Sequence, residues 1–118
     1  MIPIIPPLLE AAIVEQPSVE TRSYSPAVAR SFVRIKVKGF GWSEDEWVCL
    51  DELIHRESSW DMTANNPNSS AYGLFQVLKT PEDSTLKQQV KRGIKYLDAR
   101  HSGSACKALE HHDRKGWY

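Results

Sequence analysis

One acidic residue, Glu57, has surroundings that suit acid–base chemistry. It lies near the end of an apolar stretch, where residues 53–60 read LIHRESSW, and a polar turn sequence that contains Gly73, AYGLFQ, occupies residues 71–76. A carboxylic acid at the end of an apolar helix, facing such a turn, can keep its proton and give it to a leaving oxygen atom. The sequence therefore predicts a general acid at Glu57.

The helix that would carry Glu57 is predicted to begin after Ser43. Ser43 and Glu46 have the spacing of a capping box, in which a serine and a glutamate three residues later cap each other's backbone. Apolar residues then recur at the spacing of a helix face that packs on a core: Trp47, Leu50, Leu53 and Ile54. Glu57 follows Leu53 by four residues, so it belongs to the same face.

A general acid must hold its proton near neutral pH, whereas a solvated glutamate has a pKa of about 4.3. Burial against apolar or aromatic groups raises this pKa because it disfavours the charged carboxylate. Such surroundings are expected from four residues: Trp47, Leu50, Leu53 and Trp60. The alternative is a structural role, in which Glu57 ends its helix and pairs with Arg56 or with a lysine.

The segments around Glu57 and Gly73 resemble the signature of the lytic transglycosylase and goose-type lysozyme family. That signature has an Arg-Glu-Ser element followed by an Ala-Tyr-Gly-Leu-Phe-Gln element, and the resemblance covers residues 41–118. It implies a mostly α-helical, lysozyme-like domain, expected at residues 25–118, with a short irregular or β element. It also implies cleavage of peptidoglycan at the β-1,4 bond between MurNAc and GlcNAc.

As the resemblance implies, Glu57 would act alone. It would protonate the glycosidic oxygen and then, as a base, take the proton of the C6 hydroxyl of MurNAc, which leaves a 1,6-anhydro ring. Many glycosidases need a second carboxylate, but Asp61 is expected to pin its loop, and Asp51 and Glu52 are expected to be solvated. Two alternatives are hydrolysis of the same bond by water, as in a lysozyme, and a structural virion or glycan-binding protein with a vestigial site.

Seven further residues match family positions that would contact the sugar chain or orient the acid: Ser58, Asn66, Tyr72, Gly73, Gln76, Tyr96 and His111. Glycine would let a sugar ring approach the backbone, and the amide at position 76 would offer a donor and an acceptor. Structural roles are the alternatives for four of them: a helix-end hydrogen bond for Ser58, a turn for Asn66 and for Gly73, and core packing for Tyr96.

Cys49 and Cys106 show no Cys-x-x-Cys metal spacing, and two isolated buried thiols are one interpretation. Similar wall enzymes carry cysteine at both places, so the resemblance implies a disulfide as the other interpretation. His101, His111 and His112, together with Cys106, do not have the spacing of a structural zinc site. We therefore predict neither a metal nor a cofactor.

Elsewhere the pattern predicts further helices. Residues 26–39 begin after a Ser-Pro cap sequence and end at Gly39 as a C-terminal cap, although the alternation at 33–38 also fits a strand. The residues expected to face the core there are Val28, Phe32 and Ile35. A third helix is expected to start at 80–83 with one apolar face: Leu86, Val90, Ile94 and Leu97. A break at 102–104 and a last helix at 106–111 follow.

The 118-residue chain is long enough for one small domain, and its fifteen basic and fifteen acidic residues cancel. No electrostatic preference for nucleic acid or membrane is therefore expected. The proline-rich residues 1–24 are predicted to be an extended arm, with no signal peptide and no transmembrane segment. The expected partner is peptidoglycan. The expected location is a virion, where the arm would join other subunits, or the cell wall after release.

Overall fold

Four helices make up most of residues 23–118, the part of the chain that this computed structural model describes. They are α2 (Pro26–Gly39), α3 (Glu44–Ser58), α4 (Leu86–His101) and α5 (Ala105–Lys115). The mostly α-helical fold class predicted from the sequence is confirmed. The predicted arm at residues 1–24 lies outside the described residues except for its last two.

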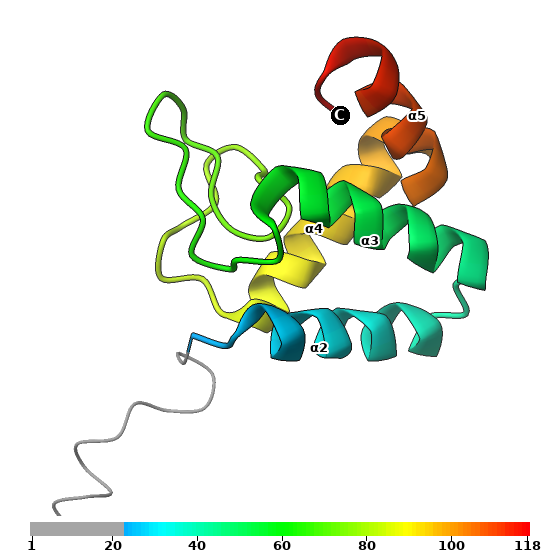
Figure 1. The fold of residues 1–118 in the computed structure, drawn as a ribbon, viewed down its shortest axis with the longest axis horizontal. Helices are drawn as coiled ribbons and strands as arrows, with labels where there is room; N and C mark the ends of the chain where they lie inside the picture. Colours follow the sequence, from blue (N-terminus) through cyan, green and yellow to red (C-terminus); the bar gives the residue numbers. More distant parts are fainter. Residues whose placement is uncertain (1–22) are drawn as a thin grey trace, which may run out of the picture.

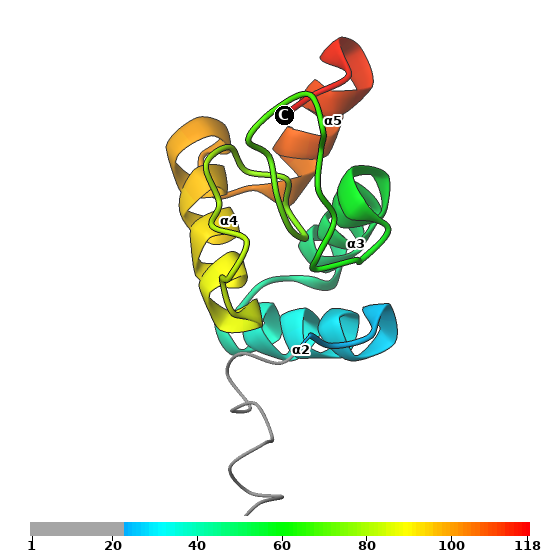
Figure 2. The same ribbon diagram turned by 90° about the vertical axis from the view of Figure 1, so that its left-hand side faces the viewer.

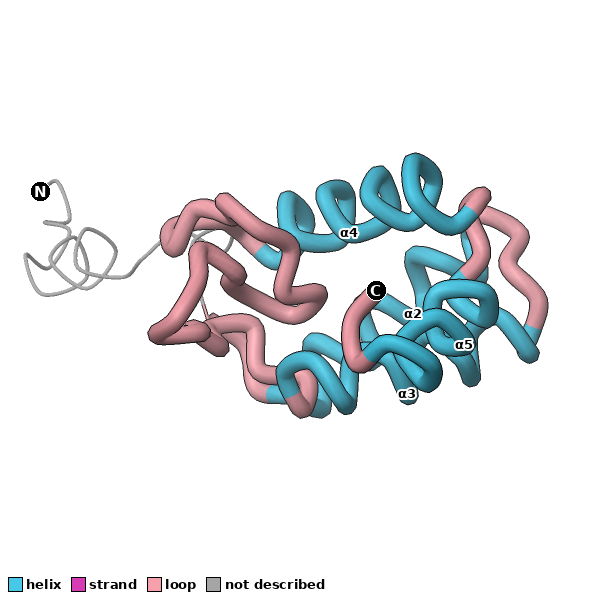
Figure 3. Tube along the Cα trace, turned by 90° about the horizontal axis from the view of Figure 1, so that it is seen from above, coloured by secondary structure: helices cyan, strands magenta, loops and turns pink. Residues whose placement is uncertain are grey.

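The helices form an antiparallel pair with two more helices beside it (Figure 1). α2 and α3 run in opposite directions, joined by residues 40–43, and α5 lies on the side of α3 away from α2. α4 begins beside α2 and ends beside α5, as the turned view in Figure 2 also shows. Residues 59–85 form a loop region at one end, and the end of the chain lies between it, α4 and α5 (Figure 3).

The segment 26–39 is a helix and not a strand, and Ser25 caps it as predicted, because its Oγ accepts the Val28 N–H at 3.3 Å. The predicted core face of this helix is wrong at Val28 and Ile35. The fully buried residues recur at intervals of four: Ala29, Val33 and Val37. Val28 and Ile35 are 49% and 73% exposed, and Phe32 is partly buried. The small side chains of the buried stripe let α2 lie against α3, which leaves the larger ones outside.

The end of α2 also differs from the prediction. Gly39 is its last helical residue, and Phe40 is the cap with right-handed helical angles. The left-handed residue that turns the chain toward α3 is Gly41, with a φ of 89°. Glycine adopts that angle without the strain that a Cβ would bring.

α3 begins after Ser43, whose Oγ accepts the Glu46 N–H at 3.2 Å. The predicted capping box is only half present, because the Glu46 carboxylate reaches the start of α5 instead. It accepts the Ser104 hydroxyl at 2.7 Å and the Ala105 N–H at 2.6 Å. A long-range contact thus replaces the local one that the pattern predicted.

α4 begins at Leu86 and not at 80–83. Thr85 and Gln88 form a reciprocal capping box that sets this boundary, while the Ser84 N–H closes a turn on the Pro81 carbonyl at 3.0 Å. The predicted break holds, since Ser102 is the left-handed C-cap of α4. α5 is longer than predicted and continues to Lys115.

The residues predicted to form the buried face of α3 are all buried: Trp47, Leu50, Leu53 and Ile54. The short irregular element expected near residue 72 consists of two isolated β-bridges, in which Tyr72 pairs with Asn65 and with Val77. No helix within residues 23–118 combines the length and the apolar character needed to cross a bilayer.

Candidate acid–base site

Glu57 lies in the last turn of α3 with 18% of its side chain exposed. It lines a cavity of about 440 Å³ between the end of α3, the turn at 76–78, α4 and the residues after α5. The other lining residues are Gln76, Val77, Leu78, Tyr96, Arg100, Trp117 and Tyr118. The carboxyl group thus stands in the wall of an open space and is itself largely shielded from water.

The aromatic neighbours of Glu57 are not the tryptophans that the sequence pattern indicated. The Trp47 ring packs on Trp60 with ring centroids 6.0 Å apart, and the guanidinium of Arg30 lies over Trp47 at 5.3 Å. Both indoles therefore lie on the side of α3 that faces α2. Tyr96 and Tyr118 line the Glu57 cavity instead, with ring centroids 5.2 Å apart.

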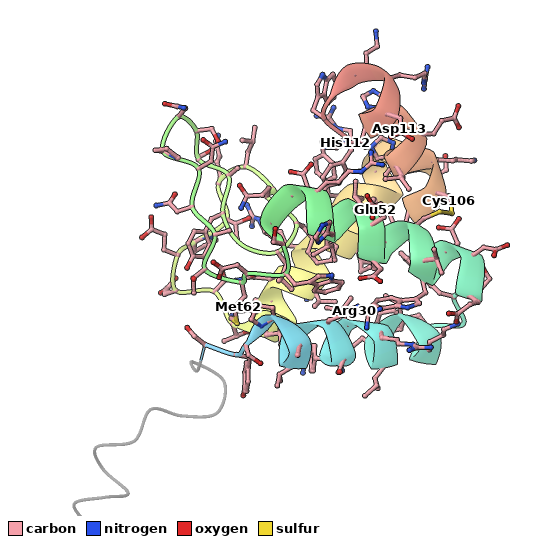
Figure 4. All side chains as sticks on the ribbon, viewed as in Figure 1. Arg30, Glu52, Met62, Cys106, His112 and Asp113 are labelled. Atoms are coloured by element: carbon pink, nitrogen blue, oxygen red, sulfur yellow. A yellow bond between two sulfur atoms is a disulfide. The ribbon has the colours of Figure 1, made fainter. Side chains whose placement is uncertain are left out.

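Burial raises the pKa of Glu57 above its usual range, and His112 opposes part of that rise. The Nε2 of His112 lies 3.1 Å from a Glu57 carboxylate oxygen. The alternative pairing of Glu57 with Arg56 is wrong, because Arg56 binds Glu52 at 3.0 Å and also binds Asp113. Figure 4 shows His112 and Asp113 on the last turns of α5, directed toward the end of α3.

Of the two neighbouring histidines, His112 contacts Glu57, whereas the predicted role of His111 as a substrate contact stays a prediction. His111 points its Nδ1 at the Trp117 carbonyl oxygen, 2.8 Å away, and packs its ring edge-on against that indole. His112 contacts Glu57 because it lies seven residues after the fully buried Ala105 and four after the fully buried Ala108. The face of α5 that packs on α3 therefore includes position 112. The spacing of His112 from Ala105 and Ala108 is the signal in the sequence that could have identified it.

Ser58 holds the turn at 71–76 and does not line the cavity. Its hydroxyl donates to the Leu74 carbonyl at 2.8 Å, which ties the end of α3 to the turn. Gly73 has a φ of 85°, and a Cβ there would lie 2.5 Å from the side-chain oxygen of Gln89. This close packing requires a glycine at position 73, and the contact of this glycine with a sugar ring stays a prediction.

Gln89, which sequence reasoning missed, positions the whole turn. It is 3% exposed, and its side chain accepts the Leu74 N–H at 2.9 Å and donates to the Met62 carbonyl at 2.8 Å. A buried amide that satisfies two backbone groups fixes the loop region on α4. The signal in the sequence that could have identified Gln89 is its position next to Val90, which places a polar residue on the apolar face of α4.

Gln76 and Tyr96, both predicted, do line the cavity with Glu57. The Gln76 amide nitrogen donates to the carbonyls of Ala64 at 3.0 Å and Gly73 at 2.8 Å. Its side-chain oxygen accepts no hydrogen bond from residues 23–118, so it can accept one from a ligand. The guanidinium of Arg100 lies 5.6 Å from the centre of the Tyr96 ring.

Asn66 and Tyr72 do not line this cavity. The Asn66 side-chain oxygen accepts the Asn68 N–H at 3.0 Å, which makes a local turn. Tyr72 forms the two β-bridges, and burial raises the pKa of its hydroxyl. The structure gives both residues a role in the loop region.

Among the described residues, no second aspartate or glutamate side chain lines the cavity. Asp61 accepts the Thr63 N–H at 2.9 Å and so pins its loop, as predicted. Asp51 is not simply solvated: it binds Arg30 at 2.7 Å and the Trp60 indole N–H at 2.9 Å. The hydrogen bond from Arg30 holds the pKa of Asp51 below its usual range.

Five cavity residues were missed in the sequence: Val77, Leu78, Arg100, Trp117 and Tyr118. Tyr118 is 7% exposed. Its hydroxyl donates to the Phe75 carbonyl, and its own carbonyl oxygen lies 2.7 Å from the Nε2 of His101. Burial raises the pKa of the Tyr118 hydroxyl well above its usual range. Trp117 is 55% exposed and presents an open indole face.

Cys49 and Cys106 form a disulfide between α3 and α5. Within residues 23–118, no cluster of three or more histidine, cysteine, aspartate or glutamate side chains could hold a metal ion. Comparisons with protein-family models, with curated proteins and with solved structures found no match for this chain.

Proposed function

We propose that this protein is a peptidoglycan lytic transglycosylase with a reduced lysozyme-like fold, in which Glu57 is the single acid and base. The observation that carries the proposal is a largely buried glutamate in the wall of a cavity that no second aspartate or glutamate among the described residues lines. Its burial raises the pKa of the carboxyl group, which is the direction that a general acid requires. The sequence resemblance around Glu57 and at residues 71–76 supplies the substrate class.

In the proposed reaction, Glu57 protonates the oxygen of the bond between MurNAc and GlcNAc. The bond breaks as a positive charge develops on the MurNAc ring, and the substrate's N-acetyl group stabilises that charge. Glu57, now a carboxylate, takes the proton of the C6 hydroxyl, whose oxygen closes the 1,6-anhydro ring. One residue then suffices because no attacking water has to be activated on the opposite face of the sugar.

The other cavity residues suit a polar sugar chain with anionic substituents. The indole of Trp117 and the ring of Tyr96 offer apolar faces for sugar rings. The side-chain oxygen of Gln76 can accept the N–H of an N-acetyl group. Arg100 supplies a cation for a carboxylate, such as that of the lactyl group or peptide stem of MurNAc.

Two alternatives rest on the same site. A water molecule in place of the C6 hydroxyl would make the enzyme a hydrolase of the lysozyme type. A structural virion or glycan-binding protein would keep the cavity and cleave nothing. We propose a virion or the cell wall as the place of action, with residues 1–24 as a region that can join other virion subunits.

One assay separates these possibilities. Purified peptidoglycan is incubated with wild type, Glu57→Gln and the control Glu110→Gln, which changes an exposed acid of α5, and the fragments are identified by mass. We expect anhydro-muropeptides from wild type and control, and a loss of about 10²–10⁴-fold in Glu57→Gln. Fragments with reducing ends would support the hydrolase. No fragments from any of the three proteins would support the structural alternative.

A further inference from the structure

A groove between α2 and α4 lies away from the Glu57 cavity and consists of two adjoining hollows of about 610 and 240 Å³. They share Phe32, Lys36 and Lys87, so they continue into one another along α2. The apolar lining comes from both helices and from the residue before α2: Tyr24, Val28, Phe32, Phe40, Leu86, Val90 and Ile94. None of these residues lines the Glu57 cavity.

The groove leaves apolar side chains in contact with water. Val28 is 49% exposed and Phe40 is 64% exposed, at opposite ends of the groove. Contiguous apolar surface of this kind, bordered by polar residues, marks a place where another segment binds. Its polar border is basic, because Lys36, Lys87 and Lys91 line it and no acidic residue within 23–118 does.

We propose that the groove binds the chain's own residues 8–14, which read LLEAAIV. This segment is apolar, and residues 1–22 carry three acids, Glu10, Glu15 and Glu20, against one base, Arg22. The segment itself carries Glu10 and no base, and the residues after it add Glu15 and Glu20 against Arg22. This negative charge complements the three lysines of the groove. A second copy of the groove would bring the same lysines together in a two-fold contact, which their like charges oppose.

The position of the segment in the chain favours this occupant. The described chain starts at Ser23, beside Tyr24 in the lining of the first hollow. The nine residues 15–23 can span up to about 30 Å when extended, whereas the sixteen steps from Tyr24 to Phe40 along α2 cover about 24 Å. A tether this short gives an effective concentration in the millimolar range, so a modest intrinsic affinity suffices.

The test is photo-crosslinking in the full chain, with p-benzoylphenylalanine in place of Val28. Leu78, which is 60% exposed and lines the Glu57 cavity, is the matched control position. We expect cross-links from position 28 to peptides that contain residues 8–14, and none of these from position 78. Circular dichroism establishes that both substituted proteins are folded, which is expected because both positions are exposed.

Two variants of the position-28 protein sharpen the result. Leu9→Asp with Ile13→Asp should remove these cross-links, because the segment loses its apolar residues. Lys87→Glu with Lys91→Glu should lower their yield about twofold to fivefold, the range expected for exposed ion pairs. An unchanged yield in the first variant would overturn the proposal.

The partner is identified by cross-linking a mixture of isotopically light and heavy protein. The absence of light–heavy products supports binding within one chain. Light–heavy products in the proportion that random pairing of the two proteins gives would show that a second copy fills the groove and would overturn the proposal, as would equal yields at positions 28 and 78. The readout does not involve glycan cleavage, so it is independent of the proposed function.

Discussion

The contact of α3 with α5 is held by several specific interactions, whereas α2 and α4 border an open groove. α3 and α5 are joined by the Cys49–Cys106 disulfide and by the Glu46 carboxylate, which binds the first residues of α5. The His112–Glu57 pair and an ion pair between Arg56 and Asp113 lie at the other end of the same contact. α2 and α4 instead leave a groove with exposed apolar side chains.

This difference shows where the molecule needs fixed geometry. In the proposed reaction, Glu57 can act as an acid only if its burial and its distance from His112 stay constant, and both depend on how α5 lies on α3. Side chains that act in chemistry are positioned best by elements that are themselves held by further contacts. The groove supports no side chain of the Glu57 cavity, so it can remain open to bind a segment.

Removal of the disulfide should have the largest effect on stability. Cys49→Ser with Cys106→Ser removes a cross-link between two residues that lie 57 positions apart in the chain. Because the unfolded chain is then less constrained, the free energy of unfolding should fall by about 3–4 kcal/mol. Urea denaturation followed by circular dichroism measures this fall. A loss no larger than that of an exposed serine substitution on α2 would contradict the importance of the α3–α5 contact.

Glu46→Gln should have the next largest effect. The charged carboxylate accepts hydrogen bonds from Ser104, Ala105 and Cys106, and weakening these charge-assisted bonds should lower the free energy of unfolding by about 1–3 kcal/mol. The control is Asp45→Asn, which changes an exposed acid in the same first turn of α3. If both variants lower the free energy of unfolding equally, the interaction of the acid with the helix dipole explains the effect, and the contact with α5 does not.

His112→Asn should change the pH dependence of Glu57. His112 lowers the pKa of Glu57 against the rise caused by burial, so its removal should raise that pKa further. The pH above which Glu57 loses its proton, and with it the alkaline limb of glycan cleavage, should then move upward. A carbon-13 NMR titration of Glu57 measures the same pKa without any activity.

The matched control for this titration is His111→Asn, since His111 contacts Trp117 and not Glu57. A downward shift of the Glu57 pKa in His112→Asn would show that the imidazole does not act as a cation toward the carboxylate. An equal shift in both variants would point to a general loosening of α5.

Local signals in the sequence predicted the helices and the position of the acid. Ser25 and Ser43 cap the helices that their patterns indicated, and the apolar stripe of α3 correctly placed Glu57 on a partly buried face. These features depend on residues three or four positions apart, so the local sequence is enough to predict them.

The residues that complete the site depend on distant contacts, so the local pattern did not reveal them. Gln89 binds Leu74 and Met62, which lie 15 and 27 residues away in the chain. Gly73 is required by the side chain of Gln89 and not by a turn alone. The choice between His111 and His112 depends on which face of α5 meets α3. Tertiary packing sets each of these, and it can override a local preference.

The smallest effect is expected on the outer face of α2, where the sequence pattern had predicted core. Ile35 is 73% exposed and lines neither hollow of the groove, so Ile35→Ser should change the free energy of unfolding by about 0.5 kcal/mol or less. Val37, two residues on, is fully buried, and Val37→Ser should lower that free energy by about 2 kcal/mol because it removes buried methyl groups and buries a hydroxyl. Urea denaturation of the pair therefore identifies the face of α2 that packs on α3. If the free energy of unfolding falls by about 2 kcal/mol in both variants, α2 is buried on both faces. The contrast between the tightly held α3–α5 contact and the exposed surface of α2 is then wrong.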